Sequence, residues 1–551
     1  MTRLLKKIPA IRFSLKPALL CLLAGAALAC CFPKPGVSLL AWFAPAVFFY
    51  FIRRTESAYQ AGILGSAFGF AFCGVTLHWV YLTCRFAGVS VPVSALALAM
   101  LAGLLCLNWA LYGVWARHLA RRLPVAALPW AWALSWTALE SASAHWTPRV
   151  AADLLAYTQW RYLPMIQVGA LLGPHGLGFV IMLWNGALAE FPFLDFGSAV
   201  RQGGRVRNLA LAGILILSCA AYGSVAISGR KHTRFAGLRE AGLRERKKPQ
   251  AAEGSEWVRI EVLQPNIDQY QKWDGRYEET IRGTFDGLLS SRRHERPDLV
   301  VWPESALPGW LDEPGNLRLI AGWARRLRTR MLVGSVSRVG PRRYNSAVLI
   351  GPDGSPEGIY HKRQLVPFGE FVPLRRWLEG SIGILAQMGD FDAGAPRQKL
   401  FAPGFGPLAV TICYEAAFPH LVRRDSARGA RILVNVTNDG WYKDTAGPLQ
   451  HFGTNVFRAV ENRATVVRAA NTGISGFIDP YGVVGASIGI EEKGRLAFAL
   501  PREDPFPRGS LYSRAGDWFG FGAMLASAGL LAWSLRGRRR DAARDKRREK
   551  S

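Results

Sequence analysis

Residues 408–415 read Leu-Ala-Val-Thr-Ile-Cys-Tyr-Glu, and this stretch indicates both the fold and the chemistry of the surrounding domain. Its first five residues are mostly apolar and partly β-branched, so they predict a buried strand over 408–412. The strand ends at Cys413, and Glu415 follows two residues later. Active sites of layered α/β domains collect at strand ends. Cys413 is therefore a candidate nucleophile.

Similar strand-like runs occur on both sides of this stretch. Short runs rich in β-branched residues predict further strands at 257–263, 299–302, 331–336, 346–350, 432–436 and 465–469. Helical stretches lie between several of them, at 277–294, 315–329 and 447–463. Asp353-Gly354 predicts a turn between 346–350 and the short strand at 359–360. This alternation of strands and helices predicts a layered α/β domain.

Two other reactive side chains follow strand ends or lie on loops. Glu304 comes just after the strand 299–302, within Trp-Pro-Glu-Ser. Lys362 and Glu370 lie in the loop Tyr-His-Lys-Arg-Gln-Leu-Val-Pro-Phe-Gly-Glu, which leaves a hairpin. A nearby ammonium lowers the pKa of a thiol, and a carboxylate accepts its proton. A carboxylate, an amine and a thiol in such positions indicate nucleophilic catalysis by Cys413.

Each of these charged residues also has a purely structural interpretation. Glu304 would serve as an ion-pair partner, and Lys362 would be a solvated charge in a basic stretch. Glu370 and Glu415 would each accept hydrogen bonds from backbone amides, a role compatible with an active site nearby. The sequence leaves these alternatives open.

Cysteine usage isolates Cys413. The chain has eight cysteines, and seven lie in or beside apolar segments: Cys21, Cys30, Cys31, Cys73, Cys84, Cys106 and Cys219. Only Cys413 falls in the α/β domain, which excludes a disulfide within that domain. A solitary thiol is either buried and inert or used for chemistry. His361 or His451 would pair with it in a Cys–His enzyme, and no spacing rule favours either one.

The rest of the chain is dominated by apolar segments. Of its 551 residues, 50% are hydrophobic, and segments long enough to cross a bilayer, about 20 helical residues, recur from the N-terminus. They are expected near 16–32, 36–53, 59–83, 88–115, 124–144, 163–190, 208–228 and 516–535. The predicted domains are a transmembrane bundle at 1–228, a basic linker at 229–256, the α/β domain at 257–505, a closing transmembrane helix at 516–535 and a basic tail at 536–551.

The basic residues predict an orientation in the membrane. The net charge is 68 − 40 = +28, and the excess clusters at 1–16, 53–54, 117–122, 201–207 and 536–550. These basic loops alternate with poor ones, so both termini are expected in the cytoplasm and the large domain on the opposite side. The basic linker 229–256 runs against this orientation, although long domains translocate largely regardless of charge. The charge thus reflects topology and lipid contact, and a nucleic-acid partner is excluded.

The first apolar segment has a second interpretation. Lys6 and Lys7, followed by an apolar run that ends Ala-Leu-Ala-Cys, resemble a cleavable signal peptide. The run reaches Pro33 without a good small-residue cleavage site, and several spans follow it. A retained membrane helix is therefore expected.

Longer motifs resemble a known family. Glu304 in Trp-Pro-Glu-Ser, Lys362 in His-Lys-Arg-Gln-Leu-Val-Pro-Phe-Gly-Glu and Cys413 in Cys-Tyr-Glu resemble the Glu–Lys–Cys triad of the nitrilase superfamily. The motifs Asn-Val-Thr-Asn-Asp-Gly-Trp from position 435 and Arg-Ala-Ala-Asn-Thr-Gly-Ile-Ser from position 468 narrow the resemblance. With apolar spans on both sides of the domain, the whole chain looks like the superfamily's membrane-embedded branch, the apolipoprotein N-acyltransferases.

This resemblance implies a nitrilase-like α-β-β-α sandwich inserted in an eight-helix transmembrane bundle. It implies a multi-pass protein of the bacterial inner membrane with its catalytic domain on the periplasmic side. The acyl donor would be a phospholipid, typically phosphatidylethanolamine. The acceptor would be the N-terminal amine of the diacylglyceryl-cysteine of an apolipoprotein, in the last step of lipoprotein maturation. No cofactor is implied.

The resemblance also implies roles for individual residues. Glu304 would be the general base, Cys413 the nucleophile that carries the acyl chain as a thioester, and Lys362 a cation that stabilises the oxyanion. Supporting or substrate-binding roles fall on Glu370, Tyr414, Glu415 and Trp273, the last within Gln-Lys-Trp-Asp.

Two other functions fit parts of the sequence. A membrane-tethered nitrilase-like amidase would use the same triad with water as the acceptor. A transporter or scaffold would use the domain only for binding, but the spans contain few charged residues and no obvious ion pathway. A Gly-rich phosphate loop, a Gly-x-Ser-x-Gly elbow and a His-Glu-x-x-His motif are all missing from the sequence. Neither a metal nor a nucleotide is expected.

Overall fold

The computed structural model describes residues 15–144, 153–191, 203–229, 238–239, 257–291, 296–372, 390–502 and 509–548. The chain divides into two compact units. The first comprises Met1–His145, Gly178–Ser218 and Phe519–Ser551, and the second comprises Trp146–Leu177 and Cys219–Trp518. The second unit contains the predicted α/β domain.

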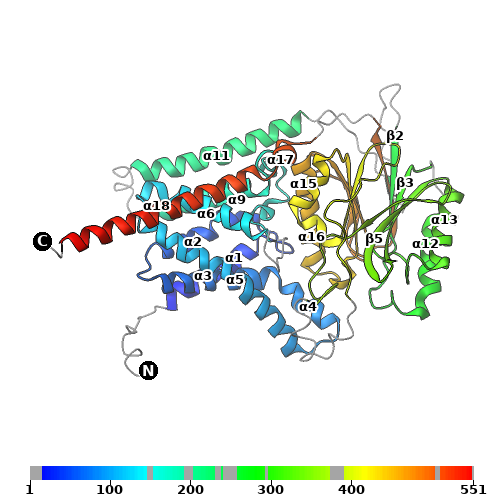
Figure 1. The fold of residues 1–551 in the computed structure, drawn as a ribbon, viewed down its shortest axis with the longest axis horizontal. Helices are drawn as coiled ribbons and strands as arrows, with labels where there is room; N and C mark the ends of the chain where they lie inside the picture. The colour runs from blue at the N-terminus through cyan, green and yellow to red at the C-terminus, as the bar shows by residue number, and fades with distance from the viewer. Residues whose placement is uncertain are drawn as a thin grey trace. The chain divides into compact units, whose positions relative to one another are not determined.

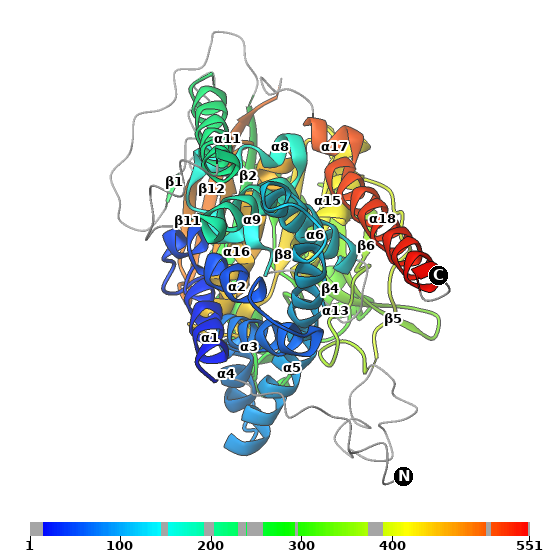
Figure 2. The ribbon, with the colours of Figure 1, turned by 90° about the vertical axis from the view of Figure 1, so that its left-hand side faces the viewer.

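Apolar helices make up the first unit and continue across its boundaries. They are α1 (Leu15–Ala29), η2 (Ser38–Trp42), α2 (Ala44–Ile52), α3 (Ala58–Thr76), α4 (His78–Phe86), α5 (Val91–Ala120), η3 (Val125–Ala127), α6 (Leu128–Ser143), α9 (Pro174–Glu190), α11 (Gly203–Ser228) and α18 (Trp518–Arg548). Helix α3 packs between α1 and α5, and the three lie side by side in Figure 2.

Every predicted membrane span contains one or more of these apolar helices, but their lengths differ from expectation. Among the described residues, four helices are long and apolar enough to cross a bilayer: Ala58–Thr76, Val91–Ala120, Gly204–Ser228 and Trp518–Arg536. A fifth span arises if Leu163–Leu172 and Pro174–Glu190 are counted together, although they bend by 117° at their junction. The eight-helix bundle therefore remains a prediction.

The bend between these two segments has a clear local cause. Gly173 separates them with a φ of +68°, a value that favours glycine. A Cβ atom at this position would lie 2.4 Å from the ring of Tyr512. The predicted continuous helix over 163–190 is consequently wrong, because the chain turns sharply at this glycine.

The second unit contains two β-sheets. Its strands are β1 (Leu238–Arg239), β2 (Trp257–Gln264), β3 (Leu299–Val301), β4 (Arg330–Val339), β5 (Arg342–Ile350), β6 (Pro356–His361), β7 (Leu408–Ile412), β8 (Ile432–Thr437), β9 (Thr465–Ala470), β10 (Ser475–Ile478), β11 (Val484–Ile488) and β12 (Gly494–Pro501). One sheet has the order β1-β12-β2-β3-β4-β5-β6 and the other β11-β10-β9-β8-β7. Strands β2–β4 and β7–β9 run parallel, and the outer pairs run antiparallel.

Helices and short turns connect the strands. They are η4 (Leu155–Gln159), α7 (Leu163–Ile166), α8 (Gly169–Leu172), η5 (Gly275–Tyr277), α12 (Glu278–Ser290), α13 (Pro314–Leu327), η7 (Cys413–Ala417), α15 (Pro419–Ala427), η8 (Asp439–Trp441), α16 (Ala446–Asn462) and α17 (Leu511–Ala515). All the predicted strands and helices of the domain are confirmed within a few residues, as is the turn at Asp353-Gly354 between β5 and β6.

Alternating side chains along the strands produce four layers. Ile260, Leu299 and Val410 belong to one core between the two sheets, while Val300 and Met331 point away, into a second core formed with α12 and α13. Figure 1 shows α12 and α13 on one side of the sheets and α15 and α16 on the other. The α-β-β-α sandwich is thus confirmed.

Candidate active site

The candidate nucleophile begins a turn directly after β7. Cys413 has a φ of +52°, which an L-residue adopts only at a cost in free energy. This conformation ends the strand and starts the five-residue turn η7. Glu415, two residues on, is fully buried and caps the strand by accepting a hydrogen bond from the N–H of Ile412. The local sequence therefore ends β7 abruptly, at the thiol.

Glu304 occupies an equally constrained position after β3. The next residue, Ser305, has a φ of +45°. The backbone at Pro303 and Glu304 passes so close to β4 that a Cβ on Gly334 would lie 2.6 Å from the Glu304 Cα atom. Only glycine permits this approach. The carbonyl oxygen of Glu304 accepts a 3.0 Å hydrogen bond from the buried Nζ of Lys272.

Lys362 follows β6 and lies between two carboxylates. Its Nζ is 2.8 Å from Glu370 Oε1 and 3.5 Å from Glu304 Oε1, and its side chain is 1% exposed. The amide of Asn345, on β5, donates to both carboxylates, at 2.7 Å to Glu304 and 2.8 Å to Glu370. Burial disfavours the ammonium, but Glu370 and Glu304 outweigh it and raise the pKa of Lys362 well above its usual range. The lysine is therefore a fixed positive charge.

Cys413 shares this electrostatic environment. Burial raises the pKa of its thiol to about 12, and Glu304 adds to the rise. Lys362 and a hydrogen bond from the Thr437 side chain act in the opposite direction. The expectation that a nearby ammonium lowers the thiol pKa is therefore wrong for the resting site, because burial and Glu304 outweigh Lys362. At pH 7 a pKa of 12 leaves about one thiolate in 10⁵ molecules.

The predicted supporting residues fall into three groups. Glu370 Oε2 accepts from the N–H of Val366, so this residue combines an amide contact with its ion pair to Lys362. Tyr414 packs edge-on against Phe418, with ring centroids 4.9 Å apart. Trp273 is 51% exposed, whereas its neighbour Lys272 is buried.

Glu415 is a bracing residue. Its Oε1 accepts hydrogen bonds from the N–H groups of Arg363 and Gln364, and its Oε2 accepts from the hydroxyl of Tyr360 and the N–H of Ile412. Four donors thus converge on one fully buried carboxylate. Glu415 joins the segment that carries Lys362 to the strand that ends at Cys413. The prediction that it holds backbone amides is confirmed.

The two histidines considered as thiol partners have other contacts. His361 Nδ1 lies 2.8 Å from Ser346 Oγ, and its ring stacks on Tyr344. His451 Nε2 lies 2.9 Å from the carbonyl oxygen of Cys413 and so contacts the backbone of the candidate nucleophile.

Several residues of the site were missed from the sequence. Asn438 and Asp439 follow β8, and the backbone N–H of Asn438 donates to Glu304 Oε2 at 2.8 Å. The rule used for Glu304 and Cys413, that strand ends gather at one edge, would have found both. Lys272 and Tyr442 lie on loops and carry no comparable signal. Burial, with Cys413 and Asp439 nearby, raises the pKa of the Tyr442 hydroxyl well above its usual range.

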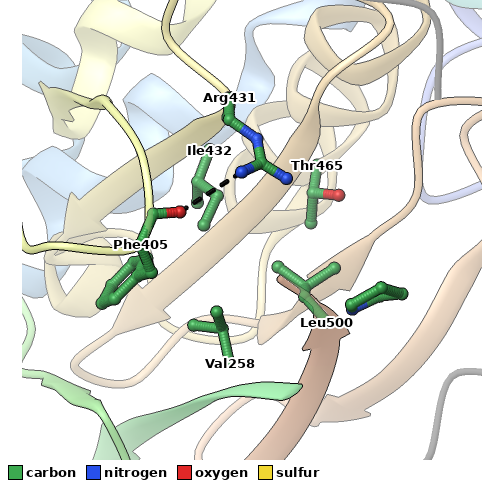
Figure 3. Close-up of a pocket in the computed structure, with 7 residues that line it drawn as sticks. Val258, Phe405, Arg431, Ile432, Thr465 and Leu500 are labelled. Carbon is green, nitrogen blue, oxygen red and sulfur yellow. Dashed lines mark hydrogen bonds between the residues drawn. The ribbon is translucent and has the colours of Figure 1, made fainter. Parts of the chain in front are cut away.

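A small hollow lies away from these residues. It is lined by Val258, Phe405, Arg431, Ile432, Thr465, Leu500 and Pro501 (Figure 3). It meets β2, β8 and β9 near their first residues, whereas Cys413, Glu304 and Asn438 follow the last residues of parallel strands. Arg431 crosses it and donates to the carbonyl oxygen of Phe405. The hollow is therefore separate from the candidate site.

A buried thiol after one parallel strand, with a carboxylate and an ammonium coupled to it inside an α-β-β-α sandwich, is the arrangement of a carbon–nitrogen hydrolase domain. A carbon-nitrogen hydrolase family model matches residues 269–504. A second model, the apolipoprotein N-acyltransferase N-terminal domain, matches residues 24–187.

Relatives match over nearly the whole chain. An apolipoprotein N-acyltransferase from Geobacter metallireducens is 34% identical over 534 residues, covering 94% of this chain and 95% of its own. One from Methylococcus capsulatus is 30% identical over 544 residues, covering 96% and 97%. The chain belongs to the apolipoprotein N-acyltransferase family. The predictions of an N-acyltransferase of lipoprotein biosynthesis, of a lipoprotein substrate and of membrane association are thereby confirmed.

Solved structures resemble only the catalytic domain. An amidase from Nesterenkonia sp. is 22% identical, covers 45% of this chain and 92% of its own, and has a TM-score of 0.35. The NitFhit protein of C. elegans is 20% identical, covers 45% of this chain and 61% of its own, and has a TM-score of 0.36.

Proposed function

We propose that this enzyme moves an acyl chain from a phospholipid, phosphatidylethanolamine foremost, through a thioester on Cys413 to the N-terminal amine of a diacylglyceryl-cysteine. The observation that supports this most is the coupling of Cys413 to both Glu304 and Lys362 in one buried cluster. Cys413 is also the sole cysteine of residues 257–505. A thioester is a better acyl donor to an amine than an oxygen ester, which gives a reason for a thiol here.

In the first half of the reaction, the thiol attacks an ester carbonyl of the phospholipid. Glu304 takes the Sγ proton as the sulfur–carbon bond forms, and the carbonyl oxygen becomes an oxyanion that Lys362 stabilises. When this intermediate collapses, the carbon–oxygen bond to glycerol breaks. The leaving alkoxide takes the proton from Glu304 and departs as a lysophospholipid. Cys413 then holds the acyl chain.

In the second half, the lipoprotein amine attacks the thioester. A second oxyanion forms at the same carbon, next to Lys362, and Glu304 accepts a proton from the attacking nitrogen. Collapse of the intermediate breaks the carbon–sulfur bond, and the sulfur regains a proton from Glu304. The products are an amide on the lipoprotein and the free thiol, so the enzyme returns to its starting state.

The raised pKa of the thiol supports general-base catalysis. A thiol whose pKa is about 12 is protonated in the resting site, so its proton must move as attack begins. Glu304 is held for this task by three contacts: Asn345 at Oε1, the Asn438 N–H at Oε2 and Lys272 at its carbonyl oxygen. A carboxylate fixed in this way accepts the proton without first reorganising.

We further propose eight membrane spans, with both termini in the cytoplasm of a bacterium and the catalytic domain, residues 257–505, on the periplasmic side of the inner membrane. The apolar helix in each predicted span and the alternation of basic and poor loops support this topology. Digestion of spheroplasts with an external protease tests it. Cleavage within 257–505 in intact spheroplasts is expected, and protection of that domain until lysis contradicts the orientation.

Mass spectrometry of the purified protein tests the chemistry. Incubation with phosphatidylethanolamine bearing an isotope-labelled acyl chain should add one labelled chain to Cys413, removable by neutral hydroxylamine. Added diacylated lipopeptide should then remove the label from the enzyme and gain it as an amide. Cys413→Ser is the matched control, since any ester on serine resists neutral hydroxylamine. Release of labelled free acid with no gain on the lipopeptide would favour the amidase, and a wild-type enzyme that never gains label contradicts the scheme.

A further inference from the structure

The backbone carbonyl of Cys413 is held by two side chains from other elements. His451 Nε2, on α16, lies 2.9 Å from this oxygen, and Asn435 Nδ2, on β8, donates to it at 3.2 Å. A carbonyl oxygen only accepts hydrogen bonds, so Nε2 of His451 carries the donated proton. These contacts act on the one residue of the turn that has a left-handed φ. Such a conformation persists only where its surroundings fix it.

The ring of His451 is itself fixed by a buried ion pair. Its Nδ1 lies 2.9 Å from Asp439 Oδ1 and 3.2 Å from Arg468 Nη2. Arg468 donates to Asp439 Oδ2 at 2.7 Å and also to the side-chain oxygen of Asn435. Burial alone would raise the pKa of Asp439, but Arg468 and His451 outweigh it and hold that pKa at about 2. A permanent ion pair therefore sets the orientation of the ring.

Helix α16 meets the nucleophile turn at a second point. Arg458, seven residues after His451 and so on the same face of the helix, donates from Nη1 to the carbonyl oxygen of Ala416 at 3.3 Å. Its Nη2 donates to Glu461 Oε1 at 2.6 Å and to the Tyr157 hydroxyl at 2.9 Å. Arg458 thus anchors the far end of the turn, so loss of the His451 contact should release the cysteine end alone.

We propose that His451 is a positioning residue for acyl transfer, which holds the carbonyl of Cys413 and thereby keeps the thiol in its attacking position. The peptide group that it holds also contains the N–H of Tyr414, whose direction is fixed by the same contact. Both half-reactions form and break a bond at Cys413, so both depend on this contact. The inference rests on the proposed role of Cys413 as the nucleophile.

Three variants separate positioning from general stability. His451→Gln keeps an N–H donor at the end of a side chain, whereas His451→Met has similar length and no donor. Thr454→Val is the matched control, because it removes a buried hydroxyl of α16 that bonds only to the His451 carbonyl within the helix. For each, the rate of label gain on Cys413 from phosphatidylethanolamine micelles, the rate of transfer to lipopeptide, both KM values and the thermal unfolding midpoint are measured.

The methionine variant should slow both half-reactions by about 10- to 100-fold, the effect of one buried hydrogen bond, with both KM values nearly unchanged. The glutamine variant should recover to within about fivefold of wild type, and the valine control should match it. All four proteins should show similar unfolding midpoints.

The outcomes separate this inference from the proposed function. A wild-type enzyme that gains no label at Cys413 contradicts the proposed function itself. A wild type that gains label while the methionine variant stays within about twofold of it overturns the role of His451, as does a change confined to KM. If the methionine variant does not fold, the glutamine variant decides: a folded protein slowed more than about 100-fold overturns the proposal.

Discussion

Replacing Lys272 with methionine tests the support of the general base and its energetic cost. Lys272 is 1% exposed, and its ammonium donates to the carbonyl oxygen of Glu304. Burial lowers the pKa of Lys272 to about 8 from an ordinary value of 10.5, although Glu304 opposes the shift. The difference, 10.5 − 8 = 2.5 units, corresponds to about 3 kcal/mol of destabilisation by the buried charge.

The pH at which this cost disappears follows from the direction of the shift. Below pH 8 the lysine is protonated in both the folded and the unfolded protein, so the whole cost is present. Between pH 8 and 10.5 the folded protein releases the proton first, and stability gains about 1.4 kcal/mol per pH unit. Methionine has no proton to release. The free energy of unfolding of wild type minus that of Lys272→Met should therefore rise by about 3 kcal/mol across this range.

At pH 7 two effects of the substitution oppose each other. The variant no longer buries a charge, which favours it by about 3 kcal/mol, but it loses a charged hydrogen bond worth about 1.5–3 kcal/mol. The two proteins should therefore differ by less than about 2 kcal/mol. Activity should nevertheless fall, because the carbonyl of Glu304 loses the donor that fixes the turn beside Ser305 and its φ of +45°.

Denaturant unfolding in detergent, followed by tryptophan fluorescence at several pH values, measures the stability difference. Acyl-enzyme formation measured by mass spectrometry at pH 7 gives the activity. Lys493→Met is the matched control, since Lys493 is an exposed lysine of the same domain, and its difference from wild type should not vary between pH 8 and 10.5. A difference for Lys272→Met that stays flat over this range would refute the assigned burial of a charge.

Three further substitutions test other contacts. Glu415→Gln turns an amide NH₂ toward donors that now meet a carboxylate, so denaturant unfolding in detergent should show a loss of about 2–4 kcal/mol; an unchanged midpoint contradicts the bracing role. Lys362→Met removes the cation beside both oxyanions, and acyl-enzyme formation, followed by quenched-flow mass spectrometry, should slow at least about 100-fold; a loss below tenfold argues against this role. Asp439→Asn tests acid stability. The pKa of Asp439 is about 2 in the folded protein against 3.8 ordinarily, so the carboxylate contributes about 2.5 kcal/mol above pH 3.8 that is lost as the pH falls to 2. Unfolding measured from pH 5 to 2 should show wild type losing that advantage over the variant, and parallel curves would rule it out.

The sequence predicts the catalytic domain well because its strands are short, apolar and bounded by polar residues. The strand at 408–412 is found with the same ends, since Cys413 breaks the run of β-branched residues. The reactive residues follow from the same pattern, because the carboxyl ends of parallel strands meet at one edge. Those ends also explain why Asn438 was within reach of the method.

Other features depend on contacts between residues far apart in the chain. Lys272 lies beside the exposed Trp273, and only the folded structure reveals that it is buried. The pKa of Cys413 depends on a balance among burial, Glu304 and Lys362 that residue types alone do not set. The bend at Gly173 arises from Tyr512, which lies more than three hundred positions later in the chain. A hydropathy pattern averages over such a turn and predicts one continuous helix.

The buried, protonated thiol of Cys413 also bears on how the enzyme survives in its surroundings. Alkylating agents and oxidants react with thiolates, and a thiol whose pKa is about 12 offers them almost none. A catalytic domain on the outer face of the inner membrane is exposed to enzymes that oxidise cysteines in pairs, and this domain has no second cysteine to pair with. The cysteine is thus protected by the same environment that makes it need Glu304: it stays unreactive until a lipid ester reaches it, and no separate reducing system is required to keep it ready.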